Sequence, residues 1–248
     1  IVLDNLYADK IYQITGHLPS LLFIPARLRW FQKNRPEIYR RISTVFSLSD
    51  WLIFRLCGAR TAEVCGAVEM GLADVASRCR SRELFDFLDL PPEIFPELVP
   101  AGTCVGKVTP GVASVTGIPD GTPVVQAAPD SHCGLIGMGV VREPQVGIVS
   151  GWSTPVQMVT GQPLFQAEPH IWTGCHVGKS WILESNAGES GNSLRWVRET
   201  LFNSGSLKDE DSFDLLDRAA LEEPNGAQGT LAFTGPETMD SGHLALRW

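Results

Sequence analysis

The pattern of apolar residues changes near residue 100, and this change constrains the fold more than any other feature of the sequence. Before it, apolar residues recur at helical spacing, as in residues 20–34. After it come short runs rich in β-branched residues, such as CVGKV (104–108) and VQMVT (156–160), with helical segments between and behind them. Strands that alternate with helices indicate an α/β architecture. The chain has 248 residues, which is enough for one large domain or two ordinary ones.

Start and stop signals place the individual elements. SLSDWLIFRLCG (47–58) predicts a short buried helix that ends at Gly58, and SRELFDFLDL (81–90) predicts an amphipathic one. The polar stretch 60–80 is expected to be a loop, and the proline-rich stretch 91–102 to lie on the surface. Further helices are expected at 110–117, 188–202 and 212–223, and further strands at 122–126, 146–150 and 180–185.

Composition excludes several classes of function. The net charge of −8 and the pI near 5.1 give no general attraction to nucleic acid or to an anionic membrane. No apolar run reaches the roughly 18 residues of a membrane span, and no signal peptide precedes the first helix, so a cytoplasmic protein is expected. The six cysteines form no C-x-x-C pair, which argues against a zinc site or a disulfide framework, and no metal ligand is predicted.

Asp130 is the one acid in VVQAAPDSHCGLIGMGVV (124–141), a run of otherwise small and apolar residues. It falls where a buried strand should end and a tightly packed helix should begin. Ligands of α/β sheets bind at such strand-to-helix corners, so a catalytic or ligand-binding carboxylate is one interpretation. The alternative is that Asp130 merely caps the helix, since Asp is a favoured N-cap residue.

Two glycine-containing stretches imitate phosphate-binding motifs and fail on spacing. GCHVGKS (174–180) lacks the first glycine of a P-loop at the required position, and it leads into an expected strand rather than a helix. Gly178 and Lys179 are therefore predicted to form a turn between two strands. GLIGMG (134–139) has its glycines in the wrong order for a dinucleotide fingerprint, and no G-x-S-x-G nucleophile elbow occurs.

Two loops of small residues remain as candidates for nucleotide contact. VSGWSTPVQMVTG (149–161) predicts two strands joined by a turn, which is either an ordinary hairpin or a turn that offers N–H groups and hydroxyls to a phosphate. NAGESGNSLRW (186–196) places a similar loop before a helix, where an anion or a ribose could bind. Together with Asp130 they suggest a nucleotide site between two domains.

Six segments in this order resemble the FGGY family of carbohydrate kinases: ITGHLPS with ARLRWFQKNRPEIYRRI, LSDWLIFRLCG, GLADV, ELVPAGTCVGKVTP, TGIPDGTPVVQAAPDSHCGLIGMGVV and SGNSLRWVRE. The resemblance covers nearly the whole chain. It implies the ribonuclease H-like, actin-type ATPase fold, with residues 1–142 as the C-terminal part of a sugar-binding domain and residues 143–248 as the N-terminal part of a nucleotide-binding domain. The implied reaction is transfer of the γ-phosphoryl group of ATP, bound with Mg²⁺, to a hydroxyl of a sugar or polyol.

The resemblance also assigns roles to residues. It implies that Asp130 is the general base that deprotonates the accepting hydroxyl, with Ser131 beside it in the substrate site. Leu22 and Phe23 fall in the sugar-facing segment. The nucleotide-side residues that it implies are Gly151, Trp152, Ser153, Thr154, Gly188, Gly191 and Asn192.

Three departures from the family pattern bear on these expectations. Trp152 follows Gly151 where the family has threonine, and Ala128-Pro129 precede the acid where it commonly has glycines. The family's D-x-G-T phosphate and metal motif and its adenine-binding end do not occur, so both domains are expected to be incomplete and this segment by itself inactive. A non-catalytic sugar-binding or regulatory relative is the alternative function. The sugar is not determined, and a homodimer is left open.

Overall fold

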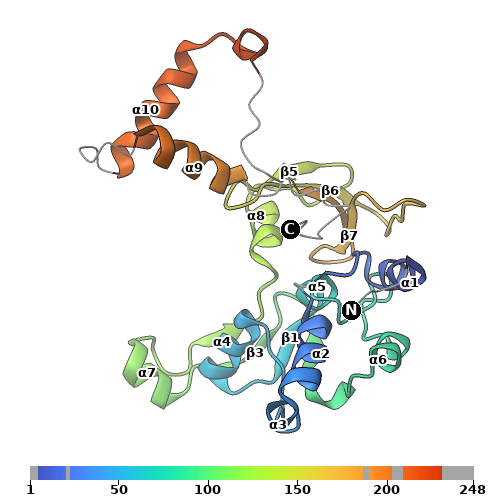
Figure 1. Ribbon diagram of the computed structural model, residues 1–248. Helices are drawn as coiled ribbons and strands as arrows, with labels where there is room; N and C mark the ends of the chain where they lie inside the picture. The colour runs from blue at the N-terminus through green and yellow to red at the C-terminus, as the bar shows by residue number, and fades with distance from the viewer. Residues whose placement is uncertain (1–4, 21–22, 187–189, 203–208, 231–248) are drawn as a thin grey trace.

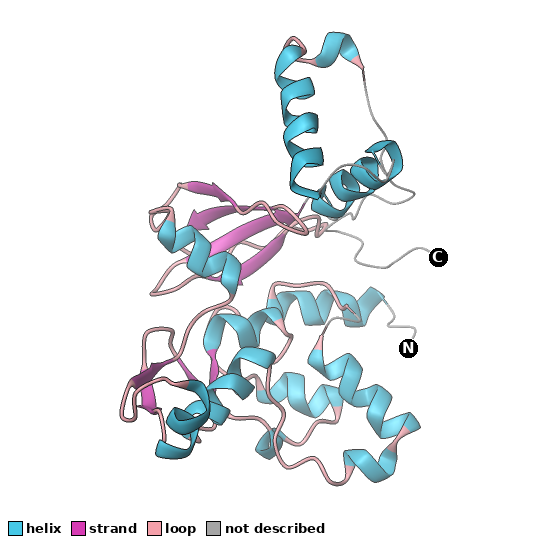
Figure 2. Ribbon diagram, turned by 90° about the vertical axis from the view of Figure 1, so that its left-hand side faces the viewer, coloured by secondary structure: helices cyan, strands magenta, loops and turns pink. Residues whose placement is uncertain are grey.

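The computed structural model describes residues 5–20, 23–186, 190–202 and 209–230. Figure 1 shows that the first half of the chain forms a helix-rich part and that α8 (Asp130–Gly137) leads from it into a sheet. Two further helices, α9 (Ser190–Phe202) and α10 (Asp209–Glu222), extend away from this sheet (Figures 1 and 2). Within the described ranges, no helix is long and apolar enough to cross a membrane.

The helix-rich part also contains two pairs of short strands. Strand β1 (Thr61–Glu63) pairs in parallel with β2 (Glu97–Val99), and β3 (Cys104–Lys107) pairs antiparallel with β4 (Pro123–Val125). A 3₁₀ turn at Pro92–Ile94 precedes β2, and another spans Ala227–Gly229. The helices of this part are α1 (Asn5–Thr15), α2 (Ile24–Asn34), α3 (Pro36–Tyr39), α4 (Leu48–Cys57), α5 (Val64–Glu69), α6 (Arg82–Leu88) and α7 (Pro110–Thr116).

Local signals fix the ends of α4 as expected. The Ser47 hydroxyl accepts a hydrogen bond from the Asp50 amide at 3.2 Å, which satisfies one donor of the first turn. Gly58 ends the helix with φ of 78°, a left-handed conformation that glycine adopts without steric cost. The expected burial is wrong, because Leu48 is 81% exposed and Leu52 is 53% exposed.

The second half builds a four-stranded antiparallel sheet in the order β5-β6-β8-β7. Its strands are β5 (Val146–Ile148), β6 (Pro155–Thr160), β7 (Trp172–Cys175) and β8 (Trp181–Asn186). The predicted turn between strands is confirmed: the His176 amide donates to the Ser180 carbonyl at 2.9 Å, and Gly178 lies within the turn with φ of 85°. The hairpin expected at 149–161 is the β5–β6 pair.

Contacts between the helix-rich part and the sheet hold the two together. Val68, Val75 and Cys175 share one buried apolar cluster, although Cys175 comes from β7 and the others from around α5. The Trp181 indole donates to the Val75 carbonyl at 2.8 Å, and the Thr173 amide donates to the Gly16 carbonyl at 3.0 Å. These contacts fix the two walls of the space between the parts.

The expected loop at 60–80 is wrong for residues 61–69 and right for 70–80, and the correction bears on the site. This stretch holds β1 and α5, and Glu63 caps α5 by accepting from the Gly66 amide at 2.9 Å. Both elements are short, and β1 exists because it pairs with β2 more than 30 residues away, as in Thr61 opposite Glu97. Local periodicity carries no signal for such a pairing. The proline-rich stretch is likewise not all surface, because Ile94 and Phe95 are buried.

Candidate active site

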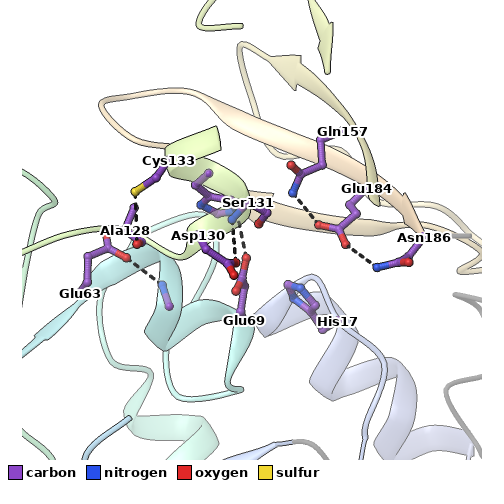
Figure 3. Close-up of polar contacts among 12 residues, drawn as sticks. His17, Glu63, Glu69, Ala128, Asp130, Ser131, Cys133, Gln157, Glu184 and Asn186 are labelled. Carbon is purple, nitrogen blue, oxygen red and sulfur yellow. Dashed lines mark hydrogen bonds and ion pairs between the residues drawn. The ribbon is translucent and has the colours of Figure 1, made fainter. Parts of the chain in front are cut away.

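A cavity of about 410 Å³ lies between the helix-rich part and the sheet. Its lining comes from the connection between α1 and α2, the C-terminal end of α5, the N-terminal end of α8, the β5–β6 turn and the strands β7 and β8. The described lining residues are His17, Ser20, Phe23, Glu69, Met70, Asp130, Ser131, Val149, Gly151, Trp152, Ser153, Pro155, Trp172, Glu184 and Asn186. Figure 3 shows that the Glu69, Asp130, His17 and Glu184 side chains point toward this common space.

Asp130 stands at the strand-to-helix corner that the sequence predicts. It is the first residue of α8, four residues after the buried Gln126 that follows β4, and it is exposed. The capping alternative is corrected, because the N-cap position belongs to Pro129. One Asp130 oxygen, Oδ1, accepts from the Ser131 amide at 2.7 Å. The carboxylate therefore keeps acceptor capacity for a ligand in the cavity.

The β5–β6 turn and the start of α9 are joined. Within the turn, the Gly151 amide donates to the Ser153 carbonyl at 3.0 Å, and from α9 the Gly191 amide donates to the Trp152 carbonyl at 3.2 Å. The hydroxyls of Thr154 and Ser190 also contact each other. Glycine is required for this approach, since a Cβ at Gly191 would lie 2.1 Å from the Gly151 carbonyl oxygen.

The structure brings some predicted site residues together and not others. Two groups of them line one cavity: Asp130 with Ser131, and Gly151 with Trp152 and Ser153. About twenty residues separate the two groups in the sequence. Phe23 also lines it, but the side chain is only 8% exposed and packs with Ile11 and Leu84. Thr154 and Asn192 are outside the lining, and Leu22 and Gly188 lie outside the described residues.

Sequence reasoning missed an ion pair behind the cavity wall. His132 Nε2 lies 2.9 Å from Glu69 Oε1, in the arrangement of an ion pair rather than of a linear hydrogen bond. The His132 side chain is fully buried, whereas that of Glu69 is 23% exposed and lines the cavity. Glu69 falls in the stretch expected to be a loop, and a lone histidine two residues after Asp130 has no distinguishing spacing. Only the tertiary contact of α5 with α8 reveals the pair.

Burial and charge act in opposite directions on this pair. Burial lowers the pKa of His132, but Glu69, and behind it Glu184 and Glu63, outweigh that effect and raise the pKa above the ordinary 6.5. Burial raises the pKa of Glu69, but His132 and the more distant His17 outweigh it and lower the pKa below the ordinary 4.5. The contact therefore favours the protonated form of His132 and the ionised form of Glu69.

Two other ionisable groups near the cavity have pKa values shifted in the direction that favours their neutral forms. Burial, together with the charge of Glu69, raises the pKa of Glu184, although Gln157 donates to it at 2.8 Å and partly opposes the shift. Burial lowers the pKa of His17, whose Nδ1 lies 2.9 Å from the Thr15 carbonyl oxygen. His17 and Glu184 are further cavity residues that the sequence patterns did not single out.

The ion pair predicts a pH window for stability. The contribution of His132 is complete below pH 6.5 and is lost as the pH rises through its raised folded-state pKa. The contribution of Glu69 is complete above pH 4.5 and is lost as the pH falls through its lowered pKa. We expect His132→Gln to lower the free energy of unfolding by about 1.5–3 kcal/mol between these values, and by less on either side. Urea denaturation of the full-length protein at several pH values measures this difference.

An exposed histidine provides the control for that measurement. His170→Gln is the matched substitution, because the His170 side chain is exposed and is not part of the His132–Glu69 pair. A destabilisation by His132→Gln that increases as the pH rises above 6.5 would contradict the assignment, since it would mean that the folded protein holds His132 neutral.

A larger cavity of about 700 Å³ lies elsewhere, lined among others by Arg78, Lys179 and Trp181. Two arginines line it. Arg78 is engaged with the β7–β8 turn: it donates to the His176, Gly178 and Ser180 carbonyls, and its guanidinium lies 4.5 Å from the Trp181 ring centroid. Arg80 lies 5.5 Å from the Phe95 ring centroid. Arg78 thus fixes the β7–β8 turn. The smaller cavity, which gathers carboxylates, hydroxyls and a glycine turn, is the candidate active site.

Solved sugar kinases share this fold. The chain superposes on a xylulose kinase from Rhodospirillum rubrum with a TM-score of 0.75 and 25% identity, covering 92% of this chain and 46% of that one. It superposes on a gluconate kinase from Lactobacillus acidophilus with a TM-score of 0.76 and 20% identity, covering 90% and 44%. The fold is that of a sugar kinase.

Sequence comparison leads to the same class. The sequence model of the N-terminal domain of the FGGY family of carbohydrate kinases matches residues 2–137, and the chain belongs to this family. It is 31% identical over 235 residues to the autoinducer-2 kinase of Escherichia coli K12, and 32% identical to that of Enterobacter sp. strain 638. Each alignment covers 92% of this chain and 44% of the relative, so the chain spans less than half the length of these relatives.

Proposed function

We propose that the protein transfers the γ-phosphoryl group of ATP to a hydroxyl of a sugar or polyol bound in the 410 Å³ cavity, with Asp130 as the general base. One observation carries the proposal: Asp130 and the Gly151–Ser153 turn line the same cavity. An acceptor hydroxyl and a phosphate can then be held in one space, which is the arrangement that phosphoryl transfer requires. We further propose that the fold is of the ribonuclease H-like, actin-type ATPase kind, with two domains divided near residue 142.

The residues of the turn fit a phosphate group. The amides of Trp152 and Ser153 donate to no backbone carbonyl within the described part of the chain, so both are available to an anion. The Ser153 hydroxyl lines the same cavity, and the adjacent start of α9 contributes the positive end of a helix dipole. These groups would hold the phosphates of ATP, and Gly191 allows the close approach of turn and helix.

Asp130 would act on the acceptor hydroxyl. Its carboxylate accepts the hydroxyl proton as the oxygen attacks, and the Ser131 amide fixes the carboxylate by its hydrogen bond to Oδ1. Bound ATP with its Mg²⁺ supplies the phosphoryl group and the positive charge that offsets the developing negative charge. The His17 and Trp172 rings, 5.1 Å apart, form an aromatic wall against which the C–H face of a sugar can pack.

ATP consumption by the full-length protein across ketoses, aldonates and polyols tests the proposal. We expect consumption that depends on one class of sugar and on Mg²⁺, above the rate without sugar. Because such a reaction uses the ATP of the cell interior, we propose that the protein acts in the cytoplasm.

Trp152 supports a second candidate function, a sugar-binding relative without turnover. Its side chain stands in the turn and is 57% exposed, where the family pattern has threonine. A folded protein that binds a sugar, measured by tryptophan fluorescence, yet consumes no ATP in its presence would favour this candidate. Sugar-dependent consumption would exclude it.

A further inference from the structure

Among the residues that the structure describes, three carboxylates and no lysine or arginine side chain line the candidate active site. Glu69 at the end of α5, Asp130 at the start of α8 and Glu184 on β8 all face it (Figure 3). None of the described lining residues is a lysine or an arginine. An anionic sugar group placed beside Glu69 and Asp130 therefore meets repulsion that no lysine or arginine of the described lining offsets.

Glu69 differs from the other two acids in how it is held. Its Oε1 pairs with the fully buried His132 on the side away from the cavity. Its Oε2 has no hydrogen-bond partner within the described ranges, although the side chain is 23% exposed and lines the cavity. A fixed carboxylate oxygen at a cavity wall is a strong acceptor for a substrate hydroxyl. Glu184, in contrast, uses its two oxygens on Gln157 and Asn186.

We propose that Glu69 is a specificity-determining residue that selects neutral polyhydroxylated substrates against sugars bearing a carboxylate or phosphate, and that His132 positions it. The inference rests on the proposed function, since it names the substrate class of the same site. A hydroxyl of a neutral ketose or polyol donates to the free oxygen of Glu69. An anionic group at the same place would lose its hydration and face Glu69 and Asp130 with no lysine or arginine beside it, so the sugar position rejects it, unlike the Trp152 and Ser153 amides proposed for the phosphates.

The test compares matched neutral and anionic sugars by binding alone. Trp152 and Trp172 line the cavity and report occupancy by fluorescence without ATP. The neutral ketose or polyol that binds best to the full-length protein is compared with the aldonate of the same chain length and configuration, for example xylitol with xylonate. We expect the neutral sugar to bind at least about tenfold more tightly. An aldonate that binds equally or better, or a panel in which no neutral sugar binds, overturns the proposal.

A pair of isosteric variants assigns the selectivity to Glu69. Glu69→Gln should bring the two affinities within about threefold of each other, mainly because the aldonate binds more tightly once the negative charge of Glu69 is removed. Glu97→Gln is the matched control, because Glu97 is exposed and lines the other cavity. Selectivity that survives Glu69→Gln in a folded protein, or that Glu97→Gln removes equally, overturns the assignment.

The role of His132 has its own readout in the pH dependence of selectivity. With His132 present, the ratio of affinities should stay constant from about pH 5 to 8, because Glu69 remains ionised. In His132→Gln the ratio of affinities should fall as the pH drops within that range. If His132 had only a structural role, the substitution would weaken the binding of both sugars, and the ratio would show no new pH midpoint. The absence of a new midpoint overturns the positioning role.

The outcome separates this inference from the proposed function. Selective binding without ATP consumption contradicts the kinase proposal and leaves the selectivity standing. Consumption that depends on an aldonate supports the kinase and contradicts the selectivity.

Discussion

Asp130→Asn should lower the rate of sugar-dependent ATP consumption by a factor of about 10²–10⁴, the usual contribution of a general base. Asparagine keeps the shape of the side chain and can still accept from the Ser131 amide, but it cannot take a proton from the acceptor hydroxyl. Because Asp130 is exposed at the first position of α8, the substitution should leave the fold intact. Steady-state kinetics give the loss of kcat, and tryptophan fluorescence shows that the sugar still binds.

The control is the same substitution at another exposed aspartate. Asp120 lies in the loop between α7 and β4, outside the cavity lining, and Asp120→Asn should leave kcat unchanged. A variant at Asp130 that retains more than about a tenth of the rate would show that another group accepts the proton.

Gly16→Ala should cause the largest loss of stability among single substitutions near the site. Gly16 has φ of 74°, a conformation that costs an L-residue about 1–2 kcal/mol. A Cβ there would also lie 1.9 Å from the carbonyl oxygen of the buried Thr173, so α1 or β7 must move. Together with overpacking of about 1–3 kcal/mol, we expect the free energy of unfolding to fall by roughly 3 kcal/mol or more in urea denaturation.

Gly117→Ala separates the two causes. Gly117 ends α7 with φ of 78°, nearly the same conformation, and a Cβ there would meet no atom within 4 Å. This variant should lose only the conformational part, about 1–2 kcal/mol. Equal losses at the two glycines would mean that the approach of α1 to β7 is not tight in solution. Because His17 follows Gly16 and lines the cavity, Gly16→Ala should also weaken sugar binding.

Elements with strong local signals are those that the sequence predicted. Ser47 and Gly58 fix the ends of α4 through a side-chain cap and a left-handed glycine, and both effects act within a few residues. The turn at Gly178 is similarly local, which is why the P-loop interpretation could be rejected from spacing alone. The corner that holds Asp130 followed from the change of pattern between β4 and α8.

Elements that depend on distant partners were missed. Strand β1 is three residues long and is defined by its pairing with β2, and α5 is six residues long and contains Gly66. The expected loop at 60–80 therefore hid Glu69. The burial of α4 was also overestimated, because the apolar content of a short helix does not reveal whether another element covers it.

The sequence by itself determined the family and the position of Asp130 at a strand-to-helix corner, since ordered motifs and local periodicity carry that information. Only the tertiary structure decided what surrounds Asp130. Glu69 and His132 lie on two helices and are 63 residues apart, and Glu184 lies on strand β8. Burial and charge nevertheless couple the pKa values of all three. Such coupling depends on distances of a few ångströms between side chains, which the folded chain fixes and the linear pattern does not record.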